Sequence, residues 1–205
     1  MISPRPGVAF SLADAGDLRS DPEARLAFAL QLGIPSDWAT VDQVHGGRVV
    51  EATGPANWGE ADAIFTRIPQ LPVAVFTADC VGVALWSEGA VGVAHAGWRG
   101  AVASVVSELF RVMTESGHPP LGAGLSPRIG PCCYEVGEEV AARFPFHNAV
   151  TTWGTRSVDL SGAVASQLPD LEVFTSELCT FHDEGLFSHR RDGTSRRMAT
   201  VAWLL

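Results

Sequence analysis

Short apolar runs, many of them rich in valine, recur along the chain and are separated by glycine, aspartate or serine. Runs of this length and composition are typical of buried strands, because branched side chains pack well on a pleated surface. They predict strands over 48–52, 72–76, 81–86, 90–94, 123–129, 171–174 and 198–204.

Helical patterns interrupt these runs. Asp21 and Pro22 form an N-cap followed by a first-turn proline, and Gly33 follows the last apolar position of that segment. Apolar residues after Ala101 recur at helical spacing and stop before Gly117, which predicts the longest helix of the chain. We expect helices over 22–32, from Val102 to Met113, over 138–144, and over 160–168, the last one ended by Pro169.

The order of these elements indicates the fold class. Strands and helices are intermixed without the regular βαβ rhythm of a doubly wound sheet. We therefore predict an α+β fold with mixed β-sheets layered with outer helices, a cysteine-hydrolase-like layered sandwich. With 205 residues and 46% apolar content the chain can bury one substantial core. Composition marks no internal boundary, so residues 1–205 are predicted to form a single catalytic domain.

Charge narrows the range of partners. The formal net charge is -9 and the pI is near 5.0, whereas binding to a nucleic acid needs a clustered excess of cations. A small anion in a local basic pocket remains compatible with this balance. Residues 1–7 lack the apolar core of a signal peptide, and no apolar run approaches a bilayer span. We expect a cytoplasmic protein without a membrane or nucleic-acid partner; the oligomeric state stays open.

The four cysteines, at positions 80, 132, 133 and 179, form no CxxC pair and lack zinc-finger spacing. This argues against a structural metal site rich in cysteine, and in a reducing compartment we expect free thiols.

Three polar residues stand at predicted corners of the fold. His45 precedes a strand beside paired glycines, Cys80 lies between two strands, and His95 lies where a strand passes into a helix. Taken singly, His45 can equally be a structural or surface histidine, and Cys80 a small buried apolar residue. If the three corners share one sheet edge, two imidazoles and a thiolate make a three-ligand zinc site with an open fourth position.

Arg99 follows His95 within the segment Ala96–Gly100, which contains two glycines at an expected helix start. Free backbone N–H groups and a guanidinium in such a place favour phosphate. Pairing of Arg99 with a surface carboxylate is the alternative.

Several blocks together resemble the bacterial laccase-domain family, also called multicopper polyphenol oxidoreductases, peptidoglycan editing factor-like, and more recently reinterpreted as purine nucleoside phosphorylases. The blocks run in family order across roughly three-quarters of the chain. They are Gln43-Val44-His45-Gly46, Ala61-Asp62-Ala63, Thr77-Ala78-Asp79-Cys80, Ala94-His95-Ala96-Gly97-Trp98-Arg99-Gly100, Ile129-Gly130-Pro131-Cys132-Cys133-Tyr134-Glu135-Val136 and Arg190-Arg191-Asp192-Gly193.

The resemblance implies one zinc ion at His45, Cys80 and His95, with copper as the less favoured metal. It implies phosphorolysis of adenosine, inosine, guanosine and methylthioadenosine, with adenosine deamination as a side activity. An activated water would attack the purine C6 in deamination, and a phosphate near Arg99 would attack the ribose C1′ in phosphorolysis.

Further residues receive roles beside this site. Asp79 either orients a ligand histidine and moves a proton, or caps a turn. Arg48 and Arg191 are weaker phosphate or ribose candidates, and Gln43 is grouped with them as substrate-binding. Cys132 and Cys133 are excluded from the ligand set because no histidine adjoins them in sequence and the resemblance assigns the metal elsewhere. The remaining histidines are assigned to loops or solvent: His118, His147, His182 and His189.

One departure concerns the N-terminus. Family members usually carry an Arg-x-Gly-Gly-Val-Ser segment near the active site, whereas Phe10-Ser11 here passes almost directly to Asp17 and the first helix. The resemblance then implies weaker purine binding or another substrate preference, with metal binding retained.

Other functions compete with this interpretation. A cysteine amidase or hydrolase editing a cell-wall precursor would use Cys80 as nucleophile with His95 or His45 as base, free of metal. A polyphenol oxidase needs several coppers, and only one ligand set is visible in the sequence, so it ranks last among the enzymes. A non-enzymatic binding module is the remaining alternative.

Overall fold

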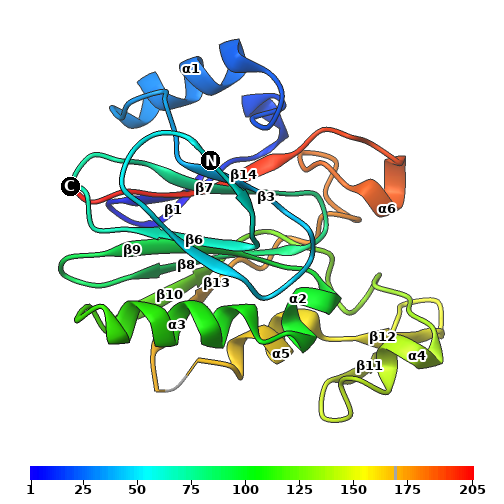
Figure 1. Cartoon of the computed structure of the whole chain (residues 1–205). Coiled ribbons are helices and arrows are strands. Elements are labelled where there is room, and N and C mark those ends of the chain that lie inside the picture. The colour runs from blue at the N-terminus through cyan, green and yellow to red at the C-terminus, as the bar shows by residue number, and fades with distance from the viewer. Residues whose placement is uncertain (169) are drawn as a thin grey trace.

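Two β-sheets pack face to face in the computed structural model, which describes residues 1–168 and 170–205 (Figure 1). The four-stranded sheet contains, in spatial order, β1 (Ile2–Arg5), β2 (Val8–Phe10), β14 (Met198–Ala202) and β7 (Val73–Thr77). The six-stranded sheet contains β13 (Glu172–Thr175), β10 (Gly122–Leu125), β8 (Val81–Trp86), β9 (Val91–Ala96), β6 (Ala63–Thr66) and β4 (Val49–Ala52). Parallel pairs, β4 with β6 and β10 with β13, stand beside antiparallel ones, so the sheets are mixed.

Smaller elements complete the chain. Two ribbons are formed by β3 (Thr40–Asp42) with β5 (Asn57–Glu60) and by β11 (Asn148–Val150) with β12 (Arg156–Val158). The helices are α1 (Pro22–Leu32), α2 (Trp98–Val102), α3 (Val105–Glu115), α4 (Glu138–Ala141), α5 (Leu160–Ala165) and α6 (His189–Asp192), with a 3-10 turn over Ala13–Ala15. In Figure 1, α1 covers the four-stranded sheet, and α3 and α5 cover the six-stranded sheet from the opposite side.

Three apolar layers follow from this stacking. Phe28 of α1 packs with Phe76 against the outer face of the four-stranded sheet, while Val75 faces the space between the sheets. Leu109 of α3 packs with Leu85 beneath the six-stranded sheet. Strands β7, β8 and β9 are covered on both faces and are therefore apolar almost throughout rather than alternating, which is why their valine-rich runs were readable in the sequence. The predicted α+β class with mixed sheets and outer helices is confirmed.

Element boundaries agree with the expectation where local signals are strong. Helix α1 has the predicted bounds: the Asp21 side chain accepts backbone N–H bonds from Glu23 and Ala24, and Gly33 ends the helix in the left-handed region. The expected strand over 123–129 ends at Leu125. Strands β1, β2, β3, β5, β6, β11 and β12, each of three or four residues, were not predicted.

The long helix expected from Val102 is wrong at its start. Ser104 has a φ of 57°, which separates α2 from α3. The reason is packing: a Cβ on Gly47 would lie 2.8 Å from the carbonyl oxygen of Ala103, and one on Gly100 would lie 3.1 Å from that of His95. These close contacts hold helix α2 against the loop that carries His45, and the chain turns at Ser104 before α3 begins.

The expected end of the fifth helix at Pro169 lies outside the described residues. Helix α5 itself ends at Ala165, earlier than the predicted Leu168. The single-domain assignment and the likeness to cysteine hydrolases stay predictions. Among the described residues, no helix combines the length and apolar character needed to cross a membrane.

Candidate metal centre

The structure brings His45, Cys80 and His95 together, with their ligand atoms all within 4.8 Å of one another. They come from the loop between β3 and β4, the connection from β7 to β8, and strand β9. The strands that precede His45 and Cys80, β3 and β7, belong to other sheets than β9, but β4 and β8 begin after these two residues at the same end of the six-stranded sheet at which β9 ends. Cys80 lies where the chain crosses between the two sheets.

Strand pairing and one carboxylate explain the convergence. Antiparallel pairing of β8 with β9 places His95 opposite Gly82, two residues after Cys80. Asp62 accepts backbone N–H bonds from Val44, His45 and Gly46 at 3.2, 2.9 and 2.6 Å, which holds the His45 loop against the sheet. Asp62 directly precedes β6, the neighbour of β9.

Asp62 also orients His95. Its Oδ1 lies 2.8 Å from Nδ1 of His95, and both side chains are buried. Burial alone would raise the pKa of this carboxyl, but the bonds from His95 and from the backbone of Gly46 and His45 hold it below its ordinary value. The Nδ1 contact directs the Nε2 of His95 toward a metal, as carboxylates commonly do for ligand histidines.

The surroundings of Cys80 and His95 favour a thiolate paired with an imidazolium. Burial opposes both charges, yet hydrogen bonds from His45 and His95 lower the pKa of Cys80 to about 6. Burial likewise opposes the imidazolium, but bonds to Asp62 and Cys80 raise the pKa of His95 to about 9. A preformed thiolate is the state in which cysteine binds metals or acts as a nucleophile.

The three side chains fit a zinc ion. A thiolate and two imidazoles are the donors that zinc prefers, and three protein ligands leave a fourth position open. Of the three side chains, His45 is exposed, Cys80 is half-buried and His95 is buried. Gly97 preserves the space between the ligands: a Cβ there would lie 3.1 Å from both Sγ of Cys80 and Cδ2 of His45.

Asp79 does not orient either histidine. Its carboxylate accepts hydrogen bonds from the Thr180 hydroxyl at 2.6 Å and the Arg190 backbone N–H at 2.7 Å. Its φ of 90° lies in the left-handed region, which aspartate tolerates better than most residues. Asp79 therefore fastens the segment before Cys80 to two later loops, and the orienting role expected for it belongs to Asp62.

Two of the predicted substrate-binding residues are engaged within the fold. Both ends of the Gln43 amide bond the backbone of Phe76, at 2.8 Å each. Arg191 donates to the carbonyls of Thr180, Phe181, Asp183 and Leu186 and to the carboxylate of Asp192, which occupies its guanidinium. The Arg191 guanidinium has no donor left for a ligand, and the two bonds of Gln43 fix the orientation of its amide against Phe76.

Arg48 and Arg99 are more available. Arg48 is exposed and makes one bond to the carbonyl of Glu60 at 2.9 Å. Arg99 is exposed and stacks on the Trp98 ring, 4.3 Å from its centroid. Among the described residues Arg99 forms no ion pair. The structure therefore does not support the alternative in which Arg99 pairs with a surface carboxylate.

Tyr134 adds a residue that sequence reasoning did not single out. Burial and the charges of Cys80 and Asp79 raise its pKa to about 12, against the opposing charges of Arg190 and Arg99. The charges of Cys80, Asp79 and both arginines thus act on the Tyr134 hydroxyl. Arg190 lies over the Tyr134 ring, 5.4 Å from its centroid, and borders a hollow of about 410 Å³ that Trp153 and Phe181 also line.

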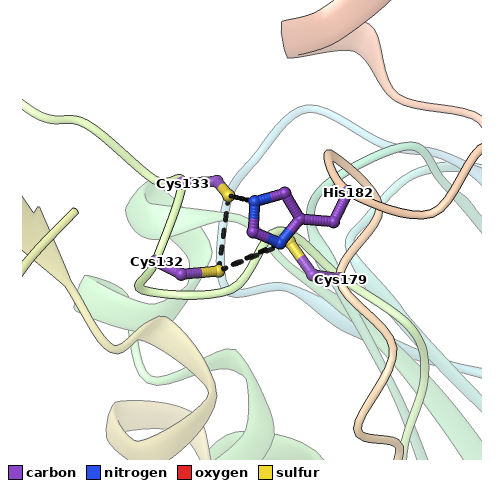
Figure 2. Close-up of side chains that lie close together, drawn as sticks. All are labelled: Cys132, Cys133, Cys179 and His182. Atoms are coloured by element: carbon purple, nitrogen blue, oxygen red, sulfur yellow. Dashed lines mark hydrogen bonds between the residues drawn. The ribbon is translucent and has the colours of Figure 1, made fainter. Parts of the chain in front are cut away.

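A second group of potential ligands, Cys132, Cys133, Cys179 and His182, also converges (Figure 2). Sequence reasoning set the two adjacent cysteines aside because no histidine adjoins them, yet Sγ of Cys133 lies 3.2 Å from Nε2 of His182. That histidine is 49 residues away in sequence, so no local spacing revealed the contact. The expectation of free thiols agrees with the four unpaired cysteines.

The chain belongs to the multi-copper polyphenol oxidoreductase laccase family, whose model matches residues 10–205. The chain is also similar to a purine nucleoside phosphorylase of Streptomyces griseus. The two sequences are 39% identical over 92% of this chain and 85% of the Streptomyces protein. A purine nucleoside phosphorylase of Mycobacterium tuberculosis (strain H37Rv) is 37% identical over 99% of this chain and 88% of that protein. The purine nucleoside phosphorylase YfiH of Escherichia coli is 35% identical over 84% of this chain and 76% of that protein.

Solved structures share the fold. YlmD from Geobacillus stearothermophilus superposes with a TM-score of 0.83 at 25% identity, covering 100% of this chain and 98% of its own. The hypothetical protein YfiH of Bacillus licheniformis gives a TM-score of 0.86 at 24% identity, covering 97% and 92%. The layered arrangement of mixed sheets is therefore that of its family.

Proposed function

We propose that this chain is a zinc-dependent purine nucleoside phosphorylase acting in the cytoplasm on adenosine, inosine, guanosine and methylthioadenosine. Relatives named purine nucleoside phosphorylase, at 35–39% identity over most of the chain, support this class of enzyme. The observation that carries the proposal is the convergence of the ligand atoms of His45, Cys80 and His95 within 4.8 Å of one another.

The reaction needs an anion held against the ribose. A phosphate oxygen forms a bond to C1′ while the bond from C1′ to the purine nitrogen breaks, and the purine leaves with the electron pair and takes a proton. Arg99 has no carboxylate partner among the described residues and can bind the phosphate; Arg190, beside Tyr134, is a second cation for it. Cations placed around the phosphate favour its approach and hold it in line.

The metal adds a second kind of chemistry. A bound zinc ion supplies a Lewis acid and lowers the pKa of water. Asp62 keeps His95 in the tautomer and orientation that a metal ligand needs. We extend the proposal to adenosine deamination at the same place, in which a water activated by the metal would attack the purine C6 and displace ammonia.

Product analysis tests this proposal. Purified protein is incubated with adenosine with and without phosphate, and the products are separated by liquid chromatography, beside a His95→Ala variant and a His118→Ala control. Adenine that requires phosphate and disappears only in the His95 variant is the expected result. Inosine formed without phosphate would support the deaminase alone, and no product under either condition would overturn the purine assignment.

A second candidate function, a cysteine hydrolase, is favoured by the thiolate–imidazolium pair of Cys80 and His95. Such an enzyme would work without metal and act on an amide, for instance in a cell-wall precursor. Chelation then leaves turnover of the amide intact, whereas alkylation of Cys80 abolishes it. A phosphorylase that needs its metal loses activity under both treatments.

A further inference from the structure

The second ligand group joins two segments that lie beside the candidate metal centre. Cys132 and Cys133 belong to the loop after β10, and Cys179 and His182 to the loop after β13. Figure 2 shows the three sulfurs and the imidazole directed toward one another. Four soft or borderline donors from two separate loops, with no charged partner for the thiols among them, are an arrangement that structural zinc sites commonly use.

The spacing of these atoms suits a tetrahedral ion. Zn–S bonds of about 2.3 Å and Zn–N bonds of about 2.0 Å set tetrahedral S···S separations near ~3.8 Å and S···N separations near ~3.5 Å. Sγ of Cys132 lies 3.8 Å from that of Cys179 and 3.3 Å from that of Cys133. Sγ of Cys133 lies 3.2 Å from Nε2 of His182. Movements of a few tenths of an ångström would complete the geometry.

The surroundings of Cys179 also suit a bound thiolate. The backbone N–H of Gly130 donates to its sulfur at 3.2 Å, and the backbones of Phe181 and His182 contribute further bonds. A Cβ on Gly130 would lie 3.2 Å from Sγ of Cys132 and 3.5 Å from Sγ of Cys179, so glycine leaves the sulfurs room to approach. Backbone donors of this kind offset the negative charge that three thiolates bring to one ion.

We infer that Cys132, Cys133, Cys179 and His182 bind a second zinc ion, which is structural. Four protein ligands fill its coordination, so no position remains for substrate. Its place in the fold suggests its role. Thr180, next to Cys179, bonds the carboxylate of Asp79, and Arg190, whose backbone N–H bonds the same carboxylate, donates to the carbonyl of Glu135, two residues after Cys133. The ion would fasten together the two loops that form one wall of the candidate metal centre. This inference does not depend on the reaction proposed above.

Measurement of the metal content tests this inference without any substitution among Cys132, Cys133, Cys179 and His182. The wild-type protein, purified after expression with zinc, is expected to hold two zinc ions per chain by elemental analysis, and His95→Ala is expected to keep one. After cobalt exchange, the ion left in His95→Ala should show strong thiolate charge-transfer absorption, consistent with three sulfurs. A zinc-free His95→Ala protein that is folded by circular dichroism would overturn the inference, as would copper in place of zinc.

Variants of the second site complete the test. Cys179→Ser and His182→Ala should each retain the zinc at Cys80 and lose the other, whereas His118→Ala, remote from both groups, should keep two. If Cys179→Ser does not fold, His182→Ala still decides, because its side chain is exposed. A disulfide between Cys132 and Cys179 would lower the intact mass by the two hydrogen atoms lost on oxidation and would remove two titratable thiols. That result would replace the ion by a disulfide and overturn the proposal.

Discussion

The carboxylate of Asp62 bonds Nδ1 of His95 at 2.8 Å while it also accepts three backbone N–H groups from the loop that carries His45. One buried side chain thus sets the position of two of the three candidate ligands. Its burial means that these bonds are not exchanged for water, so their loss has no substitute.

We expect Asp62→Asn to lower zinc affinity by roughly 10–100-fold, the usual cost of losing a carboxylate behind a ligand histidine. The amide would also set an NH₂ group against the backbone donors of the loop, which costs about 1–3 kcal/mol of folding free energy. Competition with a chelator measures the affinity. Asp42→Asn makes the same chemical change at an exposed carboxylate and serves as control; equal affinities in the two variants would contradict the role of Asp62.

Gly97→Ala is expected to reduce zinc affinity by roughly tenfold or more without unfolding the protein. The new methyl would lie 3.1 Å from Sγ of Cys80 and from Cδ2 of His45, within the space that the ligands share. Gly97 has a φ of -71°, which alanine adopts freely, so backbone strain does not confuse the result.

Gly137→Ala is the matched control for that substitution. Gly137 is also a helix N-cap, with a φ of -75°, and a Cβ there meets nothing within 4 Å. Zinc titration and thermal unfolding are measured for both variants. If Gly97→Ala binds zinc as tightly as Gly137→Ala, the space at Gly97 has no part in metal binding.

How far the sequence predicts this site depends on whether the signal is local. His45, Cys80 and His95 stand at changes of element that glycines and apolar runs reveal, so they were singled out as candidates, and the resemblance to the family then implied that they form one ligand set. Asp62 stands before β6, a four-residue strand that the pattern did not reveal, and its role depends on the pairing of β6 with β9. Arg191 looked like a phosphate ligand because nothing in a sequence tells which backbone carbonyls will surround a guanidinium.

The fold shows the same division. Helix α1 was predicted to the residue because its cap and its terminal glycine act within a few positions. The break at Ser104 was not, because its cause is the contact of Ala103 with Gly47 in a distant loop. The group of Cys132, Cys133, Cys179 and His182 likewise forms only when β10 and β13 pair side by side.

Alkylation of Cys80 in metal-free protein should follow pH with a midpoint near 6. The bonds from His45 and His95 that lower its pKa keep the thiolate populated well below the ordinary range near ~8.5. Iodoacetamide labelling followed by peptide mass spectrometry gives the rate at each pH. His95→Ala should move the midpoint upward, and added zinc should protect the thiol. An alkylation midpoint above pH 8 in the wild-type protein would contradict the pairing of a Cys80 thiolate with His95.

The same pKa values set the pH dependence of stability in metal-free protein. The pKa of Cys80 is lowered on folding, so its contribution is present above its unfolded value and is lost as pH falls through about 6. The pKa of His95 is raised, so its contribution is present below about 6.5 and is lost as pH rises through about 9. Because the two contributions have opposite slopes between about 6.5 and ~8.5, the free energy of unfolding of the wild type should be nearly constant there and should fall on either side. Urea unfolding measures it at each pH, and Cys80→Ala should remove the rise from the acidic side, which leaves only the fall toward basic pH.

Arg99 and Arg191 should separate ligand binding from stability. Arg99→Ala removes a cation with no carboxylate partner among the described residues, so we expect the KM for phosphate to rise about tenfold or more, with an unchanged melting temperature. Arg191→Ala removes bonds to four carbonyls that hold residues 180–186, so we expect a loss of about 2–4 kcal/mol of folding free energy. Steady-state kinetics with varied phosphate and urea unfolding measure the two effects. A raised KM for Arg191→Ala at unchanged stability would return that residue to the substrate site. An unaffected KM for Arg99→Ala would mean that the phosphate binds elsewhere, and Arg190 would then be the next residue to substitute.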